Sequence, residues 1–296
     1  MKPRTQLRQA LADRKTLHLV GAHDALSALL IQQAGFDGVY VGSYSTQATF
    51  LAKPDLELMT KTERLLIVHK IVKAVEVPVI ADMEEGYGNA IAVMEAVRDF
   101  EAAGVAGVHL DDEQTPSKCP VMQGVPLNRL IEVDEMCGKI RAAVQAREDA
   151  DFLIIARSDV VGTVTRQEYY AENRMEEVVA RSNAYVEAGA DSIMVMAFTE
   201  RELDFYAERI RAPLVGLYAP VEPHPFREFE RRGYFMAIGT IAPLYMYVRS
   251  LIDGLRELKE TADWNAVAHR MVTDAEFFTV LGLEKYRGMY EEFSIR

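Results

Sequence analysis

Residues 102–112 read Ala-Ala-Gly-Val-Ala-Gly-Val-His-Leu-Asp-Asp, which joins the end of a helix, a short apolar run and two carboxylates. Gly104 can adopt the left-handed conformation that ends a helix, and the run at 107–110 has the length of a buried strand. The same kind of junction recurs around Gly35 and Gly189. Three junctions of one kind predict a repeated strand–helix unit.

Short β-branched runs alternate about eight times along the chain with longer stretches of 3.6-residue periodicity. This alternation predicts parallel strands, each followed by a helix, and hence an α/β fold of the (β/α)8 TIM-barrel type. The strands are expected at Leu17–Val20, Gly38–Val41, Val77–Ala81, Gly107–Leu110, Phe152–Ala156, Ser192–Val195, Leu214–Leu217 and Met236–Ile238. No linker divides the chain, so we expect one domain over residues 1–296, with the barrel at about 17–260.

The composition argues against two classes of partner. Of the 296 residues 49% are apolar and 26% are charged, and a net charge of -12 disfavours binding to a phosphate backbone. No apolar run approaches the roughly 18 residues of a membrane span, and Met1–Arg4 is not followed by the apolar core of a secretion signal. The only cysteines, Cys119 and Cys137, are too few for a disulfide framework. We therefore expect a cytoplasmic protein without nucleic-acid or membrane partners.

The chain continues well beyond the eighth predicted strand. Helices are expected at 243–261 and 264–278, within a C-terminal helical region at about 243–296 that ends with Tyr286, Tyr290 and Phe293. Helices left over after a barrel has closed need another apolar surface to pack against. A neighbouring subunit would supply that surface, so the sequence predicts a homo-oligomer.

Acidic residues follow two neighbouring strands of the predicted barrel. Asp82 and Glu84 come after the third strand, and Asp111 comes after the fourth. The loops after the strand C-termini carry the chemistry of such barrels and meet at one end. Carboxylates gathered there would repel one another unless they shared a cation, and oxygen ligands suit Mg²⁺. Each carboxylate alone could simply be solvated, but the three together predict a metal site.

Other candidate groups occur at strand ends or in the loops. Arg157 ends the fifth apolar run, where its planar charged fork could bind a carboxylate or phosphonate, or pair structurally with Asp159. Lys118 precedes Cys119, and a neighbouring cation can make a thiol reactive, although most lone cysteines are inert. His109 lies inside the fourth predicted strand, where a core residue is expected rather than a base.

From about residue 17 to 239 the sequence resembles the phosphoenolpyruvate mutase and isocitrate lyase superfamily. Residues 82–89, Asp-Met-Glu-Glu-Gly-Tyr-Gly-Asn, are similar to its signature loop, which normally reads Asp-x-Asp-Thr-Gly-[Tyr/Phe]-Gly. Residues 111–112, Asp-Asp, stand where the superfamily has Glu-Asp, and residues 156–159, Ala-Arg-Ser-Asp, stand where it has Ala-Arg-Thr-Asp. Residues 54–55 look like its Pro-Asp element, and residues 42–43 look like the Gly-Ser segment that holds a pyruvyl carboxylate.

The resemblance implies a metal centre with defined ligands. Asp82 would bind Mg²⁺ directly, with Mn²⁺ as an alternative metal, and would face the substrate as well. Glu84, Asp111 and Asp55 would hold the water molecules of the ion. Two of these residues depart from the superfamily pattern, because Glu84 replaces the usual aspartate and Asp111 the usual glutamate. The carboxylates therefore keep the charge of the superfamily's metal shell, but two of their side chains differ in length.

The resemblance also implies the groups that bind and convert the substrate. Gly42, Ser43 and Arg157 would position a pyruvyl unit. In the lyase branch a gating loop that reads Lys-Lys-Cys-Gly-His supplies a cysteine that protonates the departing enolate. Residues 117–120 here read Ser-Lys-Cys-Pro, so Cys119 and Lys118 would be catalytic, together with Arg157.

The expected activity is that of a magnesium-dependent enzyme working through the enolate of a pyruvate-type unit. Because Cys119 is retained, we favour a carbon–carbon lyase for a small 2-hydroxy or 2-oxo diacid. The alternatives are a phosphonomutase or phosphonopyruvate-processing enzyme, which would use Arg157 on the phosphoryl group, and a non-catalytic barrel that binds a small acid. Pro120 and Met196 motivate the last, since Met196 stands where the lyases have glutamate and the mutases histidine. The superfamily commonly forms tetramers with swapped C-terminal helices, and the same is expected here.

Overall fold

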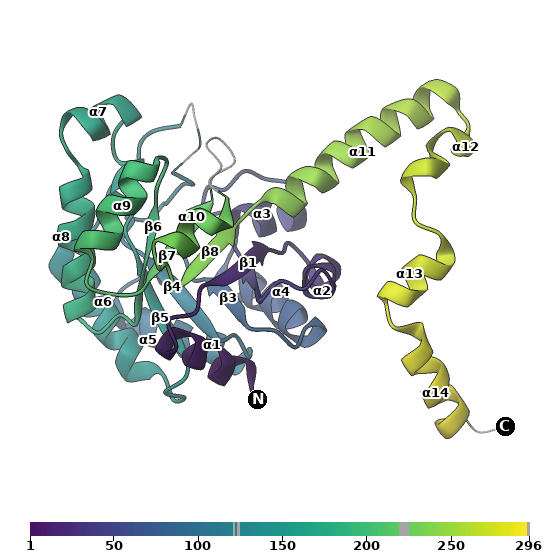
Figure 1. Cartoon of the computed structure of the whole chain (residues 1–296), viewed down its shortest axis with the longest axis horizontal. Coiled ribbons are helices and arrows are strands. Elements are labelled where there is room, and N and C mark those ends of the chain that lie inside the picture. The colour runs from purple at the N-terminus through teal and green to yellow at the C-terminus, as the bar shows by residue number, and fades with distance from the viewer. Residues whose placement is uncertain (121, 123–124, 219–224, 295–296) are drawn as a thin grey trace. The chain divides into compact units, whose positions relative to one another are not determined.

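Eight parallel strands form a closed barrel in the computed structural model, which describes residues 1–120, 122, 125–218 and 225–294 (Figure 1). The strands pair in chain order, and β8 pairs back with β1. They are β1 (Leu17–Gly21), β2 (Gly38–Val41), β3 (Val79–Asp82), β4 (Gly107–Asp111), β5 (Leu153–Arg157), β6 (Ser192–Met196), β7 (Leu214–Tyr218) and β8 (Met236–Gly239). The predicted (β/α)8 fold is confirmed.

Helices follow every strand and cover the outside of the barrel. In the first unit of the chain they are α1 (Pro3–Ala12), α2 (Ala25–Gln33), α3 (Ser43–Leu51), α4 (Lys61–Ala74), α5 (Ala90–Ala102), α6 (Val133–Ala146), η1 (Val160–Gly162), α7 (Arg166–Ala171), α8 (Met175–Glu187), α9 (Glu200–Arg209) and α10 (Phe226–Arg231). The main apolar core lies between these helices and the sheet, and includes Phe100 and Phe152.

Glycines end three of the helices just before the next strand begins. Gly35, Gly104 and Gly189 have φ angles of 86°, 95° and 110°, which lie in the left-handed region. A residue with a Cβ is strained there, so glycine lets the chain turn sharply from helix into strand. The three junctions recognised in the sequence are confirmed.

A second apolar cluster fills the barrel itself. Leu19, Ile155, Met194 and Ile238 come from four different strands and are buried together inside it. Leu7 of α1 is fully buried in the same cluster, so the N-terminal helix seals the end of the barrel where the strands begin. With that end closed and apolar, polar side chains gather at the opposite end.

The strands extend slightly further than their apolar runs. Seven of the eight end one residue later than predicted, and three of the added residues are Asp82, Asp111 and Arg157. These polar residues still pair with their neighbours, since Asp82 lies opposite His109 and Asp111 lies opposite Arg157. The ladder therefore holds charged side chains in fixed register at the mouth of the barrel.

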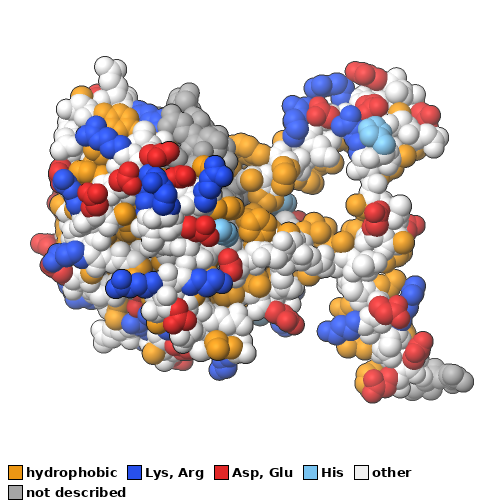
Figure 2. Space-filling view, viewed as in Figure 1, with side chains coloured by type: hydrophobic (Ala, Val, Ile, Leu, Met, Phe, Trp, Pro, Cys, Tyr) orange, Lys and Arg blue, Asp and Glu red, His pale blue; other side chains and the backbone are white. Residues whose placement is uncertain are grey.

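The chain divides into two compact units, residues 1–243 and 244–296. The second unit contains most of α11 (Ala242–Thr261), followed by α12 (Trp264–Val267), η2 (Ala268–Arg270), α13 (Asp274–Val280) and α14 (Leu283–Phe293). Many large apolar side chains on these helices are exposed (Figure 2), among them Met246, Leu255, Trp264 and Tyr290. Of the helices in the described part of the chain, none combines the length and the apolar character that crossing a bilayer requires.

Candidate active site

A single pocket at the C-terminal end of the barrel gathers every site residue predicted from the sequence. They are Gly42, Ser43, Asp55, Asp82, Glu84, Asp111, Lys118, Cys119 and Arg157. They come from the ends of β3, β4 and β5 and from the loops after β2, β3 and β4. The pocket also contains Tyr40, Glu113, Met196, Leu217 and Ile241, which the sequence analysis did not assign to the site's chemistry.

Asp82 is held rigidly at the centre of the acidic side. Its Oδ2 accepts a hydrogen bond from the Ser43 backbone N–H at 2.9 Å, and its Oδ1 accepts one from the Glu84 N–H at 2.8 Å. Glu84 has a φ of 52°, a left-handed backbone that turns its amide back toward Asp82. Two amide donors fix the orientation of the carboxylate, which keeps further lone pairs for a ligand.

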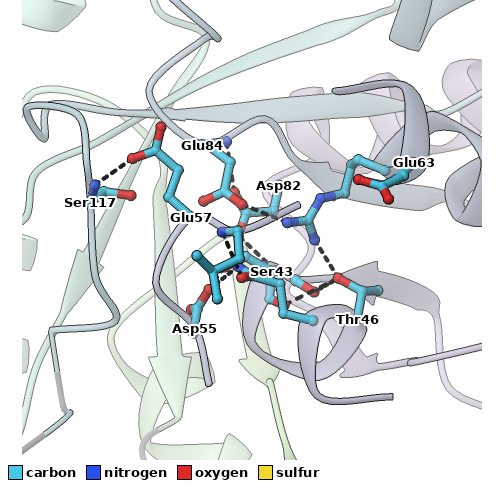
Figure 3. Close-up of polar contacts among 12 residues, drawn as sticks. Ser43, Thr46, Asp55, Glu57, Glu63, Asp82, Glu84 and Ser117 are labelled. Carbon is cyan, nitrogen blue, oxygen red and sulfur yellow. Dashed lines mark hydrogen bonds and ion pairs between the residues drawn. The ribbon is translucent and has the colours of Figure 1, made fainter. Parts of the chain in front are cut away.

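Asp55 reaches the same place from the loop after α3. Its Oδ2 accepts from Ser43 Oγ at 3.0 Å (Figure 3). Its Oδ1 accepts from Gln47 Nε2 at 2.5 Å. Gln47 is fully buried, and its side-chain oxygen also accepts from the Leu58 N–H at 2.9 Å. The Gln47 side chain thus clamps the loop on both sides of residues 56 and 57.

Glu84 forms an ion pair that the sequence analysis missed. Arg64 of α4 is fully buried, and its guanidinium lies 2.5 Å from Glu84 Oε1 while also donating to Thr46 Oγ1. The site therefore contains a second buried arginine besides Arg157. A polar residue on a helix normally indicates a solvent-exposed face, so nothing local in the sequence marks Arg64 as part of the site.

His109 connects the interior of the barrel to the acidic cluster. It is fully buried, as a core residue, and its Nδ1 lies 2.7 Å from Asp111 Oδ1. Its Nε2 lies 2.9 Å from the Tyr40 hydroxyl and 3.6 Å from Asp82 Oδ1. Burial lowers the pKa of His109, but the charges of Asp82 and Asp111 outweigh it and raise that pKa overall.

Arg157 forms the structural ion pair that was one of the two interpretations given to it, and it also lines the pocket. Its guanidinium lies 3.3 Å from Asp111 and 2.9 Å from Asp159, so the structural ion pair exists. It is buried, and among the residues that the structure describes none accepts a hydrogen bond from its Nε atom. A guanidinium with donors to spare can still engage an anionic ligand.

The electrostatics of the cluster fit a hard divalent cation. Burial, and after it the charge of Asp82, raises the pKa of Asp55 to about 6 and the pKa of Glu84 well above its usual range. Burial also acts to raise the pKa of Asp82, but His109, Arg64 and Arg157 hold it below normal. One oxygen or nitrogen each from Asp82, His109 and Asp111 lies within 4.8 Å of the others. Carboxylates that resist ionising together indicate room for a further positive charge.

The segment with Lys118 and Cys119 lies against the acidic side of the pocket. The Cys119 backbone N–H donates to the Asp55 carbonyl at 3.3 Å, and Asn128 Nδ2 donates to the Lys118 carbonyl at 2.6 Å. Cys119 is partly buried, and neither it nor Cys137 forms a disulfide. The structure therefore brings a thiol to the same pocket as the carboxylates.

Residues 7–242 match the family described as phosphoenolpyruvate phosphomutase. The chain belongs to this family. It is 36% identical to 2,3-dimethylmalate lyase from Eubacterium barkeri, over 99% of each chain. Among solved structures it is similar to phosphoenolpyruvate phosphomutase from Streptomyces platensis subsp. rosaceus, with a TM-score of 0.89 and 27% identity over 99% of each chain.

A second solved structure, phosphonopyruvate hydrolase in complex with oxalate and Mg²⁺, is 26% identical with a TM-score of 0.86 over 99% of each chain. Family membership makes the protein an enzyme of the phosphoenolpyruvate mutase and isocitrate lyase superfamily. This excludes the non-catalytic barrel that the sequence had left open.

Arg64 offers a direct test of how the acidic cluster is stabilised. Replacing it with leucine (Arg64→Leu) leaves Glu84 buried without its partner, so we expect the free energy of unfolding to fall by about 3–5 kcal/mol. The matched control Arg98→Leu removes an exposed partner of Glu95 and should cost less than about 1 kcal/mol. Urea denaturation of the metal-free enzyme measures both, and equal losses would contradict a stabilising role for the buried pair.

Proposed function

We propose that this enzyme is a magnesium-dependent carbon–carbon lyase that acts on a small 2-hydroxy or 2-oxo diacid. The observation that carries the proposal is the convergence of a carboxylate cluster and Cys119 on one pocket of a family member. Carboxylates that hold a cation suit the stabilisation of an enolate, and a thiol suits its protonation. Both groups are needed for cleavage, whereas a mutase needs only the first.

Asp82 is the proposed direct ligand of the metal, and Glu84, Asp111 and Asp55 the groups that hold its water molecules. The fixed orientation of Asp82 and the raised pKa values of Asp55 and Glu84 support this assignment. A bound Mg²⁺, or Mn²⁺ in its place, would neutralise negative charge as it develops on the substrate oxygens. The similar phosphonopyruvate hydrolase, solved with oxalate and Mg²⁺, agrees with this choice of metal.

The substrate carboxylate has a suitable binding place at the start of α3. Ser43, Tyr44 and Ser45 form the first turn of this nine-residue helix and line the pocket. Backbone N–H groups and the helix dipole favour an anion at a helix N-terminus. Gly42 precedes the helix, and a Cβ there would lie 2.6 Å from the Tyr40 ring, so a larger residue would displace that wall. Arg157 would hold the substrate from the opposite strands.

Cys119 is the proposed proton donor. For a 2-hydroxy diacid, a carboxylate of the acidic cluster would accept the hydroxyl proton, so that a 2-oxo group forms while the adjacent carbon–carbon bond breaks. The electron pair of that bond stays on the departing half as an enolate, and the Cys119 thiol protonates its carbon. The cation of Lys118, the preceding residue, would then stabilise the thiolate that remains.

Three of the four described residues that the last strands contribute to the pocket are apolar and favour an alkyl-substituted substrate, the fourth being Thr240. Met196 ends β6, Leu217 lies in β7, and Ile241 follows β8. Among the described residues that line the pocket, only Lys118 and Arg157 are cationic, so a third carboxylate would find little compensation. A methylated diacid would bury its alkyl group here, as the name of the similar 2,3-dimethylmalate lyase also suggests.

Phosphonate chemistry is the second candidate. The similarity to a solved phosphoenolpyruvate phosphomutase favours it, and Arg157 could bind a phosphoryl group. It gives no role to Cys119, however, and Met196, Leu217 and Ile241 offer a phosphoryl group no hydrogen-bond donor from their side chains. We therefore place it behind the lyase.

We also propose that residues 244–296 mediate a homo-oligomer, as a tetramer with exchanged helices. Exposed apolar side chains occur along α11 and α14, and such surfaces on soluble proteins mark interfaces. The double variant Leu251→Glu/Leu255→Glu on α11 should shift the enzyme to a smaller species in light scattering coupled to size exclusion. The control Glu257→Gln/Glu260→Gln should not, and a monomeric unmodified enzyme would contradict the proposal.

Removal of Asp82 should abolish metal-dependent ligand binding. In the unmodified enzyme, Mg²⁺ with oxalate at about 100 times its dissociation constant should stabilise the fold by about 2.7 kcal/mol, raising the melting temperature. Asp82→Ala should show no such rise, because the central carboxylate is gone. The control Asp13→Ala changes an exposed carboxylate on the closed end of the barrel. An equal rise in Asp82→Ala would contradict the assignment.

Cys119→Ala should separate the two candidate activities. We expect kcat for release of a 2-oxo acid from alkyl-substituted malates to fall by a factor of about 100 or more, the usual contribution of a general acid. Cys137→Ala should retain full activity, because Cys137 lies on α6 outside the pocket. Interconversion of phosphonopyruvate and phosphoenolpyruvate, unaffected by Cys119→Ala, would instead support the mutase.

A further inference from the structure

Glu57 lies in the loop after α3, which carries Asp55, and contacts the loop after β4, which carries Cys119. It follows Asp55 by two residues, inside the segment that Gln47 clamps through Asp55 and Leu58. Its φ angle is 55°, a left-handed conformation that residues other than glycine seldom adopt. Such conformations persist where the surrounding contacts enforce them, and they are frequent at functional sites.

The side chain of Glu57 reaches out of its own loop. Its Oε2 accepts a hydrogen bond from the backbone N–H of Ser117, as Figure 3 shows. Ser117 is buried, so this amide has little access to water. Two residues further on, the Cys119 N–H donates to the Asp55 carbonyl. The two loops are thus joined at 57–117 and at 55–119, on either side of Lys118.

The contact through Glu57 differs from the other contacts of this segment. Asn128 also holds the segment, through the Lys118 carbonyl, but it belongs to the returning part of the same connection between β4 and α6. The contact between Cys119 and Asp55 is made by backbone atoms, so no side-chain substitution removes it directly. The contact with Ser117 differs from both. Here the carboxylate of Glu57, a side chain from another loop, accepts a hydrogen bond from a backbone amide of the segment. Charge-assisted bonds of this kind are stronger than neutral ones.

We infer that Glu57 is a positioning residue that holds residues 117–119 over the pocket and so sets the place of the Cys119 thiol. The inference rests on the proposed function, since the position of Cys119 matters to catalysis only if the thiol donates a proton. Asp55 would belong to the metal shell, and Glu57 lies two residues beyond it. The loop that serves the metal therefore also orients the proton donor.

Two conservative variants separate the reach of the Glu57 side chain from its charge. Glu57→Asp keeps the charge and tolerates a left-handed backbone but is one methylene too short for Ser117. Glu57→Gln loses the charge but keeps an acceptor oxygen at the same distance. Glu76→Gln, an exposed glutamate before β3, is the matched control.

Alkylation of Cys119 by iodoacetamide, followed peptide by peptide by mass spectrometry, measures how firmly the segment is held. We expect Glu57→Asp to react about tenfold faster than the unmodified enzyme, the factor that corresponds to a loss of about 1.4 kcal/mol. Glu57→Gln should react at an intermediate or unchanged rate, and Glu76→Gln at the original rate. Cys137 is buried on α6, so its continued protection shows that each variant is folded.

Kinetics provide the second measurement. Glu57→Asp should lower kcat by about the same tenfold factor, while the KM and the affinity for Mg²⁺ with oxalate change by less than about twofold, because the ligands themselves are untouched. Unchanged alkylation in Glu57→Asp would overturn the inference, and so would an equal acceleration in the control Glu76→Gln. Alkylation needs no turnover, so it judges Glu57 even if the enzyme cleaves no diacid, and a failure of the proposed function remains distinguishable.

Discussion

Mutual repulsion among buried carboxylates is the constraint around which this end of the barrel is arranged. Five of them, Asp55, Asp82, Glu84, Asp111 and Glu113, line one pocket, and each is almost inaccessible to solvent. Charges of one sign interact strongly where water cannot screen them. The protein offsets the repulsion with three buried groups, Arg64, His109 and Arg157, each in contact with a member of the cluster. The negative charge that these groups leave uncompensated suits the small, hard cation that we propose.

The departures from the superfamily pattern make sense under this constraint. Glu84 is longer than the usual aspartate, and its extra methylene accompanies a direct contact with Arg64 on α4. Asp111 is shorter than the usual glutamate. It contacts His109 of its own strand, β4, and Arg157 of the neighbouring strand, β5. The acidic shell is thus tied both to the barrel interior and to the surrounding helices. Opposite it, the wall of Met196, Leu217 and Ile241 bears no charge. The pocket therefore has an acidic half and an apolar half, a division that suits the alkyl-substituted diacid proposed as substrate.

Much of this site could be predicted because barrel strands end at a common rim. Asp82, Asp111 and Arg157 follow apolar runs directly, so the strand pattern alone indicates that they meet. Asp55 lies far from any strand end, and only its resemblance to the superfamily's Pro-Asp element indicated a role. Cys119 was a candidate through the lysine beside it, but only the resemblance gave it a specific role. For β3, β4 and β5 the predicted ends are one residue short, because the apolar pattern stops at Asp82, Asp111 and Arg157 while the backbone ladder continues.

The amino-acid sequence by itself determined the order of strands and helices, the glycine turns between them and the set of acidic residues at the rim, because each of these is written in a local pattern of spacing or residue type. Only the tertiary structure decided which partner each charge would have. Arg64 from α4, Gln47 from α3 and Glu57 from the loop after it all contact residues that lie between 8 and 60 positions away. A polar side chain on a helix or loop looks solvent-exposed in the sequence, and it becomes part of a buried network only when barrel closure removes the water around it.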